Sequence, residues 1–266
     1  MQKPSLTADE RLKRQGDASP SRVTDLILLG ASAGGHHALA EILRTFSPEL
    51  PAAIVILLHM PLDSLGRLKE SLARSCRLPI VEVETQETLR PGFVFVPPPG
   101  WSATFSRGAI TAEHVVRERP TSTINRLFTS AARCYSNRVI GVVLTGLLKD
   151  GTEGLRAVHE AGGLTVVQDP GEAEYPDMPT NAMETLPVTF CLKLADIGPA
   201  LELLVRRTAR FETGLEVAVR MLHARTALLV RLVEQSWRNP STRTFLEGEL
   251  TSLRRAIRSI DDLLKD

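Results

Sequence analysis

The chain has 266 residues, of which 43% are hydrophobic and 24% are charged, and its formal net charge is +1. This length suits one α/β domain with a small addition. The near-neutral charge provides no basic field for nucleic acid or an anionic membrane, so we expect neither as a partner. Residues 1–22 are polar and lack the apolar segment of a secretory signal, and no apolar run is long enough to span a membrane. We therefore expect a disordered N-terminal tail, no membrane insertion and a cytoplasmic protein.

The three cysteines, Cys76, Cys134 and Cys191, are scattered and have no C-x-x-C spacing. This pattern favours free thiols over a disulfide framework or a zinc site. We expect no metal and no organic cofactor.

Apolar runs alternate with amphipathic stretches over residues 23–208. Buried strands are predicted at 25–30, 52–58, 78–84, 138–146 and 164–168, and helices at 34–46, 61–75, 121–136 and 151–162. Residues 91–112 interrupt the alternation with Pro, Gly and short alternating pieces, which predict a small β-hairpin excursion. The remainder predicts an α/β fold: a doubly wound, mostly parallel sheet with helices on both faces.

The C-terminal segment, residues 209–266, has a different pattern. Six aliphatic residues recur in alternating steps of four and three: Leu246, Leu250, Leu253, Ile257, Ile260 and Leu264. This heptad spacing predicts a helix over 240–265, preceded by a less regular helix over 211–236. The resulting two-helix hairpin either packs on its own domain or pairs with a helical partner or a second copy, and the spacing does not distinguish these.

The stretch GASAGG, Gly30 to Gly35, lies where the first strand must turn into a helix. A dinucleotide-binding loop needs a middle glycine, but Ser32 occupies that position, and His59-Met60-Pro61 follows the second strand instead of an acidic residue. A nucleophile elbow explains both departures, because small neighbours allow a sharp turn that exposes the Ser32 hydroxyl.

A serine nucleophile needs a base and a group that orients the base. His59 follows the second strand and Asp150 follows the strand at 138–146. The carboxyl ends of parallel strands open on one edge, so Ser32, His59 and Asp150 are expected to meet there. Each of these residues also has a structural interpretation when it is taken alone. Ser32 suits a helix N-cap, His59 a structural histidine and Asp150 a turn residue. We expect His36 and His37, in the first turn of the elbow helix, to be solvated or to face substrate.

At these positions the sequence resembles the catalytic domain of bacterial chemotaxis protein-glutamate methylesterases, the CheB type. The resemblance is carried by GASAGG, HMP, PGFVFVPPPG, RVIGVVLTGLLKDGTEGL, AGGLTVVQDP and DMPTNAM, over roughly residues 23–205. It implies a serine hydrolase that removes methyl esters from receptor glutamates, and in some members deamidates glutamines. The family's nucleophile, base and acid fall on Ser32, His59 and Asp150, and its oxyanion amides fall near Ala33 and Leu147. By analogy, residues 171–183, with Met178 and Pro179, would form one wall of the substrate groove.

Several residues depart from the family pattern. Ala33 replaces a usual Thr, Leu58 a usual Gln, and Leu147-Leu148 a usual Met-Gly. If the replaced glycine has positive φ, Leu148 adopts that conformation only at a cost. Only about 22 residues precede the first strand, so the sequence resembles stand-alone members that have a helical C-terminal extension and no receiver domain.

Three functions follow from these patterns. The first is methylester hydrolysis on a methylated, chemoreceptor-like protein. The second is hydrolysis of another ester or amide by the same three residues. The third is a non-catalytic signalling module that acts through the C-terminal helices.

Overall fold

The computed structural model describes residues 25–60, 68–106, 108–114, 122–206, 226, 230, 233 and 240–263. The predicted N-terminal tail lies outside these residues. The chain divides into two compact units after Arg206, two residues before the expected boundary. None of the helices in the described residues is long and apolar enough to cross a membrane.

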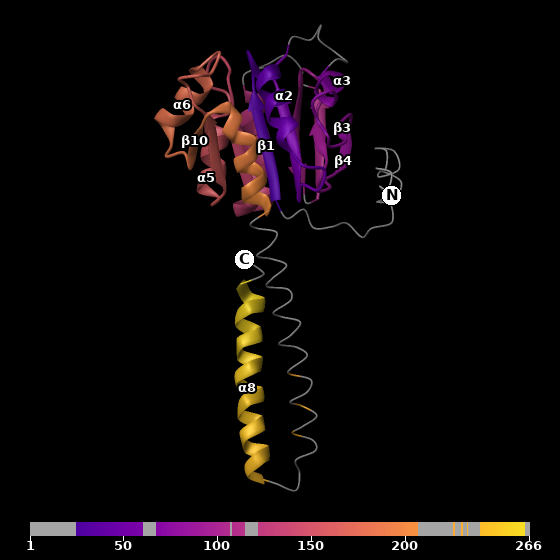
Figure 1. The fold of residues 1–266 in the computed structure, drawn as a ribbon, viewed down its shortest axis with the longest axis vertical. Helices are drawn as coiled ribbons and strands as arrows, with labels where there is room; N and C mark the ends of the chain where they lie inside the picture. Colours follow the sequence, from indigo (N-terminus) through magenta and orange to yellow (C-terminus); the bar gives the residue numbers. More distant parts are fainter. Residues whose placement is uncertain are drawn as a thin grey trace, which may run out of the picture. The chain divides into compact units, whose positions relative to one another are not determined.

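The first unit is built on a seven-stranded sheet with the order β10-β9-β8-β1-β2-β5-β3, whose strand pairings are all parallel (Figure 1). Its strands are β1 (Asp25–Ala31), β2 (Ala52–Leu58), β3 (Ile80–Glu82), β5 (Val94–Val96), β8 (Val139–Val143), β9 (Leu164–Gln168) and β10 (Phe190–Leu192). Every residue of β1, β2 and β8 is buried, as expected for parallel strands covered on both faces.

Helices cover both faces of this sheet. They are α2 (Gly35–Thr45), α3 (Leu68–Ala73), α4 (Thr123–Tyr135), α5 (Thr152–Glu160), α6 (Asp177–Thr185), the 3₁₀ turn η3 (Ser136–Arg138) and a helix over residues 194–206. Leu26 and Leu28 of β1 share a core with α4, α5 and α6, whereas Ile27 and Leu29 share one with α2, α3 and helix 194–206. This alternation along one strand confirms the doubly wound α/β prediction.

A second, antiparallel sheet contains β4 (Gln86–Thr88), β7 (Ala109–His114) and β6 (Trp101–Ser106) in that order. The β6–β7 pair confirms the predicted hairpin. The expectation that the whole of 91–112 leaves the main sheet was wrong, because β5 pairs between β2 and β3. Its residues Val94 and Phe95 are fully buried. The strand was not predicted because it is short and is flanked by prolines and glycines, which are typical of loops.

The end of the first unit contains two elements that the sequence analysis did not predict. The strand β10 pairs with β9 through Phe190–Leu192, and helix 194–206 follows it. Ile197, Leu201 and Val205 are fully buried in the same core as α2. Their four-residue spacing is helical, so this pattern could have been recognised.

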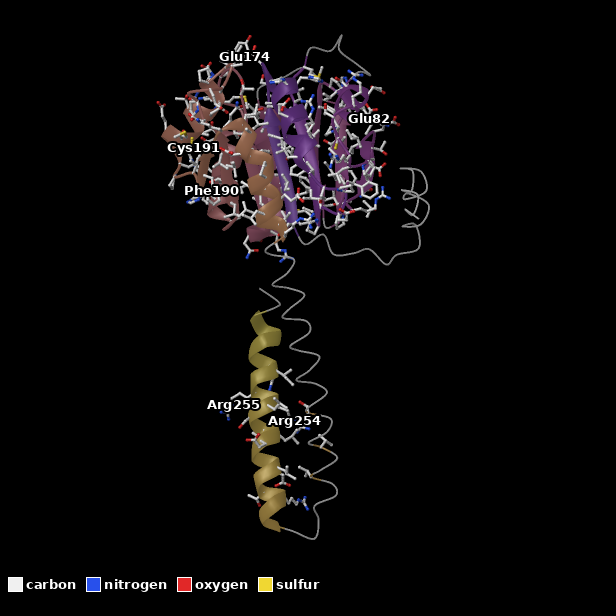
Figure 2. All side chains as sticks on the ribbon, in the orientation of Figure 1. Glu82, Glu174, Phe190, Cys191, Arg254 and Arg255 are labelled. Atoms are coloured by element: carbon white, nitrogen blue, oxygen red, sulfur yellow. The ribbon has the colours of Figure 1, made fainter. Side chains whose placement is uncertain are left out.

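The second unit contains α8 (Pro240–Leu263), which confirms the predicted second helix over the described residues. Leu250 and Ile257 are buried, and Leu246 and Leu253 are half-buried. Arg254 and Arg255, labelled in Figure 2, are exposed. The predicted helix over 211–236 lies outside the described residues except for positions 226, 230 and 233, which are helical.

Candidate active site

Ser32 lies in the turn between β1 and α2. Its backbone N–H donates to the Thr145 carbonyl at 3.1 Å, and its own carbonyl accepts from the Gly35 N–H at 2.9 Å. Gly34 has φ of 73°, in the left-handed region that glycine adopts freely. A Cβ at Gly34 would also lie 2.8 Å from Oε2 of Glu174. The glycines after Ser32 therefore allow the sharp strand-to-helix turn that a nucleophile elbow requires.

The register of the sheet brings His59 beside Ser32. In the β1–β2 pairing Ala31 is opposite Leu58, so Ser32 and His59 each follow the last paired residue of neighbouring strands. The His59 N–H donates to the Ala31 carbonyl at 3.0 Å, which continues the ladder to this point. Ser32 and His59 line one cavity of about 320 Å³.

Asp150 lies in the loop between β8 and α5, and only 4% of it is exposed. Its carboxylate accepts three backbone hydrogen bonds, from Ile124 at 3.0 Å, Asn125 at 3.0 Å and Gly151 at 2.9 Å. Ile124 and Asn125 belong to the first turn of α4, whose dipole also favours a negative charge at this end. These donors stabilise the buried carboxylate and fix its orientation.

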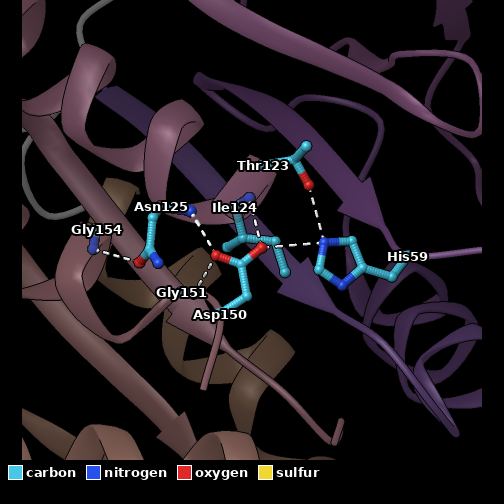
Figure 3. A network of polar contacts seen from close by, with 7 residues as sticks. All are labelled: His59, Thr123, Ile124, Asn125, Asp150, Gly151 and Gly154. Carbon is cyan, nitrogen blue, oxygen red and sulfur yellow. Dashed lines mark hydrogen bonds and ion pairs between the residues drawn. The ribbon is translucent and has the colours of Figure 1, made fainter. Parts of the chain in front are cut away.

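His59 contacts Asp150 through one ring nitrogen. Nε2 lies 3.0 Å from Oδ2 of Asp150 and 2.8 Å from Oγ1 of Thr123 (Figure 3). Within the described residues, Nδ1 takes part in no hydrogen bond. The ring is therefore held from one side by a buried carboxylate and a hydroxyl, while its second nitrogen is available to another group.

The loop after β8 packs directly on the Ser32 turn. A Cβ at Gly146 would lie 2.8 Å from Cβ of Ser32 and 2.1 Å from Sδ of Met178, so this approach requires glycine. Among the described residues, no acceptor is bonded to the backbone N–H of Ala33 or of Leu147. These two amides, predicted to bind an oxyanion, follow Ser32 and Gly146 in the two loops that meet here.

Leu148 has φ of 66°, so it occupies the left-handed region despite its side chain. The left-handed conformation that was considered for the replaced glycine is therefore present at this position. Such a backbone costs an L-residue about 1–2 kcal/mol. Two residues of α6 hold it: the Leu148 N–H donates to Oδ2 of Asp177 at 3.2 Å, and Nδ2 of Asn181 donates to the Leu148 carbonyl at 3.1 Å.

The predicted substrate contact of Met178 needs correction. Met178 is fully buried and Pro179 is buried too. The Met178 sulfur packs beneath Gly146, and its N–H donates to the Gly146 carbonyl at 3.0 Å. Since both residues are buried, they support the loop from inside and do not form the exposed groove wall that was expected of them.

The wall of the cavity comes from other residues. Beside Ser32 and His59 it is lined by Gly34, His36, His37, Leu58, Met60 and Glu174. His36 and His37 are exposed, and Nε2 of His36 lies 2.7 Å from Oγ of Ser71. The placement of the two histidines agrees with a substrate-facing position. Glu174, labelled at the edge of the unit in Figure 2, is the one member of 171–183 that lines this cavity.

Three residues that hold the site were missed by the sequence analysis. Thr123 is the first residue of α4, and its hydroxyl contacts His59. It was missed because the search for site residues considered only the ends of strands. Asn125 accepts a hydrogen bond from the Gly154 N–H at 2.7 Å, which links α4 to α5. Thr145 is buried, and its hydroxyl bonds the Ala33 carbonyl at 3.1 Å and the Tyr175 N–H at 2.9 Å. Only the position of Thr123, at the start of a helical pattern, is a signal that could have been noticed.

Comparisons with known proteins point to one family. A family profile described as CheB methylesterase matches residues 27–201. A Leptospira interrogans protein, named as a candidate protein-glutamate methylesterase/protein-glutamine glutaminase, is 37% identical over 186 residues, which cover 68% of this chain and 94% of that protein. An Anaeromyxobacter dehalogenans enzyme with the same double name is 37% identical over 200 residues, covering 73% of this chain and 58% of that enzyme.

The crystal structure of the Thermotoga maritima CheB methylesterase catalytic domain is similar in fold. It aligns with a TM-score of 0.61 and 27% identity, over 68% of this chain and 98% of that domain. Nearly the whole solved domain thus aligns with this chain. The Anaeromyxobacter enzyme also contains a large part that does not align with this chain.

Proposed function

Because the chain belongs to the CheB methylesterase family, we propose that it hydrolyses methyl esters of glutamate side chains on a methylated, chemoreceptor-like protein and releases methanol. We extend the proposal to deamidation of glutamine, the second activity in its relatives' names. The observation that carries it is the contact of Nε2 of His59 with the buried Asp150 carboxylate at 3.0 Å, beside Ser32 in one cavity. This arrangement favours a hydrolase over the non-catalytic alternative.

The first half of the proposed reaction forms an ester on Ser32. The Ser32 hydroxyl attacks the carbonyl carbon of the substrate ester, and its proton passes to Nδ1 of His59, the ring nitrogen turned away from Asp150. Asp150 and Thr123 hold Nε2–H and stabilise the charged imidazolium. The backbone amides of Ala33 and Leu147 bind the oxyanion. Collapse of the intermediate breaks the bond to the methoxy oxygen, which takes the proton from His59 and leaves as methanol.

The second half releases the product. Water gives a proton to Nδ1 of His59 and attacks the glutamyl ester of Ser32. The Ser32 oxygen then departs with that proton, and a free glutamate side chain remains. In deamidation the leaving group is ammonia in place of methanol, and the later steps are the same.

The C-terminal helices and the cellular compartment are the subject of a second proposal, which does not depend on the catalytic one. We infer that residues 211–265 bind a helical partner or a second copy of the chain, in the cytoplasm. Support comes from α8, where Leu246 and Leu253 remain half-buried and Glu247 and Arg254 are exposed beside them. The chain itself already covers Leu250 and Ile257, so a partner would contact the edges of this seam.

A methyl-release assay tests the catalytic proposal. The full chain is incubated with a helical synthetic peptide that contains one glutamate γ-methyl ester, and methanol and peptide mass are followed together. We expect equal amounts of methanol and demethylated peptide, and none with Ser32→Ala. Release that is the same with the wild type and Ser32→Ala, or no release by the wild type, would contradict the proposal.

A further inference from the structure

Two leucines that the folded core does not use stand at the edge of the site. Leu147 is 50% exposed and Leu148 is 65% exposed, although both follow a fully buried strand and precede the buried Asp150. They are adjacent in the chain, so two exposed apolar side chains follow each other in this loop. The first unit gains little from them, because side chains this exposed contribute little to a core.

The left-handed backbone of Leu148 is a second reason why stability of the fold does not explain a leucine at this exposed position. A glycine would adopt φ of 66° without strain, yet a leucine occupies the position. Asp177 and Asn181 each bond its backbone, and Nδ2 of Asn181 also donates to the Asp177 carbonyl at 2.8 Å. The first turn and a half of α6 therefore holds the strained backbone from which this exposed apolar side chain projects, which suits a contact with a ligand.

The position of the pair relates it to the substrate. The backbone amide of Leu147 is one of the two proposed donors to the ester oxygen, so its side chain starts next to the reacting carbonyl. A glutamate side chain that reaches Ser32 brings the surface of its own protein against this loop. On a helix, the residues three and four positions from the glutamate lie about 5–6 Å from it on the same face.

We propose that Leu147 and Leu148 are specificity-determining residues that contact an apolar side chain of the substrate, one helical turn from the modified glutamate. The proposal rests on the methylesterase function and names its preferred substrate: methylated glutamates on helices with an aliphatic residue at that spacing. Substrates with a polar residue there lack this contact and react more slowly, since the apolar pair then stays in contact with water or a polar group.

The test compares two helical peptides, each with one glutamate γ-methyl ester, that differ only in having Leu or Gln four residues away. For the full-length wild type we expect kcat/KM to be roughly tenfold higher on the Leu peptide. Leu148→Gly and Leu148→Asn, which suit the left-handed backbone, are expected to bring this ratio close to one. Leu148→Met keeps an apolar side chain in the same conformation, and it is expected to keep most of the preference.

Two controls separate the possible failures. Leu203→Ala removes a leucine that is 70% exposed on helix 194–206, and it should leave the ratio at the wild-type value. Thermal unfolding of each variant confirms that it is folded. If the wild type releases no methanol from either peptide, the methylesterase proposal fails. If it releases methanol without a preference, or if Leu148→Asn keeps the preference, the methylesterase stands and this inference is overturned.

Discussion

Nε2 of His59 lies 3.0 Å from Oδ2 of Asp150, so the imidazole presents its Nε2 side to the carboxylate. In the serine protease arrangement the carboxylate contacts Nδ1 and the serine contacts Nε2. Here the roles of the two ring nitrogens are exchanged, which leaves Nδ1 to receive the Ser32 proton. The neutral ring should consequently carry its hydrogen on Nε2, and this expectation shapes the predictions about the site.

Ser32→Ala is expected to abolish ester hydrolysis and to leave the fold intact. The hydrogen bonds of Ser32 to Thr145 and Gly35 use its backbone and survive the change. Loss of the nucleophile in a related triad lowers kcat by about 10⁶-fold. Rates on a small aryl ester, together with thermal unfolding, measure both parts, and an active Ser32→Ala enzyme would exclude the serine mechanism.

Asp150→Asn is expected to lower kcat by roughly 10⁴-fold, because the imidazolium loses its carboxylate and the ring its tautomer. An amide NH₂ must also face at least one of the three backbone N–H donors, which costs about 1–3 kcal/mol of stability. Nitrogen-15 spectra of the histidines should show an Nε2–H tautomer for His59 in the wild type only. The exposed Asp196→Asn serves as the control, and an unchanged tautomer in Asp150→Asn would contradict this assignment.

Thr123→Val tests the second contact of His59. Valine keeps the shape but removes the hydroxyl that lies 2.8 Å from Nε2. Losing one hydrogen bond of about 0.5–1.5 kcal/mol predicts a decrease in kcat of up to about tenfold. Thr123→Ser, which restores the hydroxyl, should recover most of the rate and the wild-type pH profile. Equal activity of the valine and serine variants would show that the hydroxyl does not position the ring.

Glu202→Gln tests how helix 194–206 is attached to the residues after α2. Burial raises the pKa of Glu202, but hydrogen bonds from Arg206 and Ser47 outweigh it, and the net pKa is lowered. A lowered pKa means that the ionised form stabilises the fold above the unfolded pKa of about 4.3, and that this stability is lost as pH falls through the folded pKa. We expect Glu202→Gln to cost about 1 kcal/mol near neutral pH.

The measurement is the midpoint of thermal unfolding for the wild type and Glu202→Gln across a pH series. Their difference should shrink as the solution becomes more acidic than the unfolded pKa. Glu49→Gln, at an exposed site after α2, should behave like the wild type throughout. A difference that grows toward acid would show that the sign is wrong.

Truncation after residue 210 is expected to leave a folded first unit that hydrolyses a small ester. The chain divides after Arg206, and the two cores of the first unit draw no described residue beyond Val205. Sedimentation of the full and truncated chains should show that any self-association is lost with residues 211–265. Insolubility of the truncated chain would favour the alternative in which these helices cover their own domain.

The sequence by itself identified the elements that local chemistry controls. Ser32, His59 and Asp150 each follow a buried apolar run, and the carboxyl ends of parallel strands necessarily share one edge. Their placement at one edge was therefore predictable without knowing which strands are neighbours in the sheet. The same holds for α8, whose heptad spacing is a local pattern.

Tertiary structure decided what depends on contacts between distant segments. Which nitrogen of His59 faces Asp150 is visible only where β2, the loop after β8 and the first residue of α4 meet, and Thr123 joins the site there. The strand β5 is too short for a periodic signal, and only pairing between β2 and β3 makes it a strand. Family analogy placed Met178 in the wall of the substrate groove, but tertiary packing buries it against Gly146, where an added Cβ would lie 2.1 Å from its sulfur.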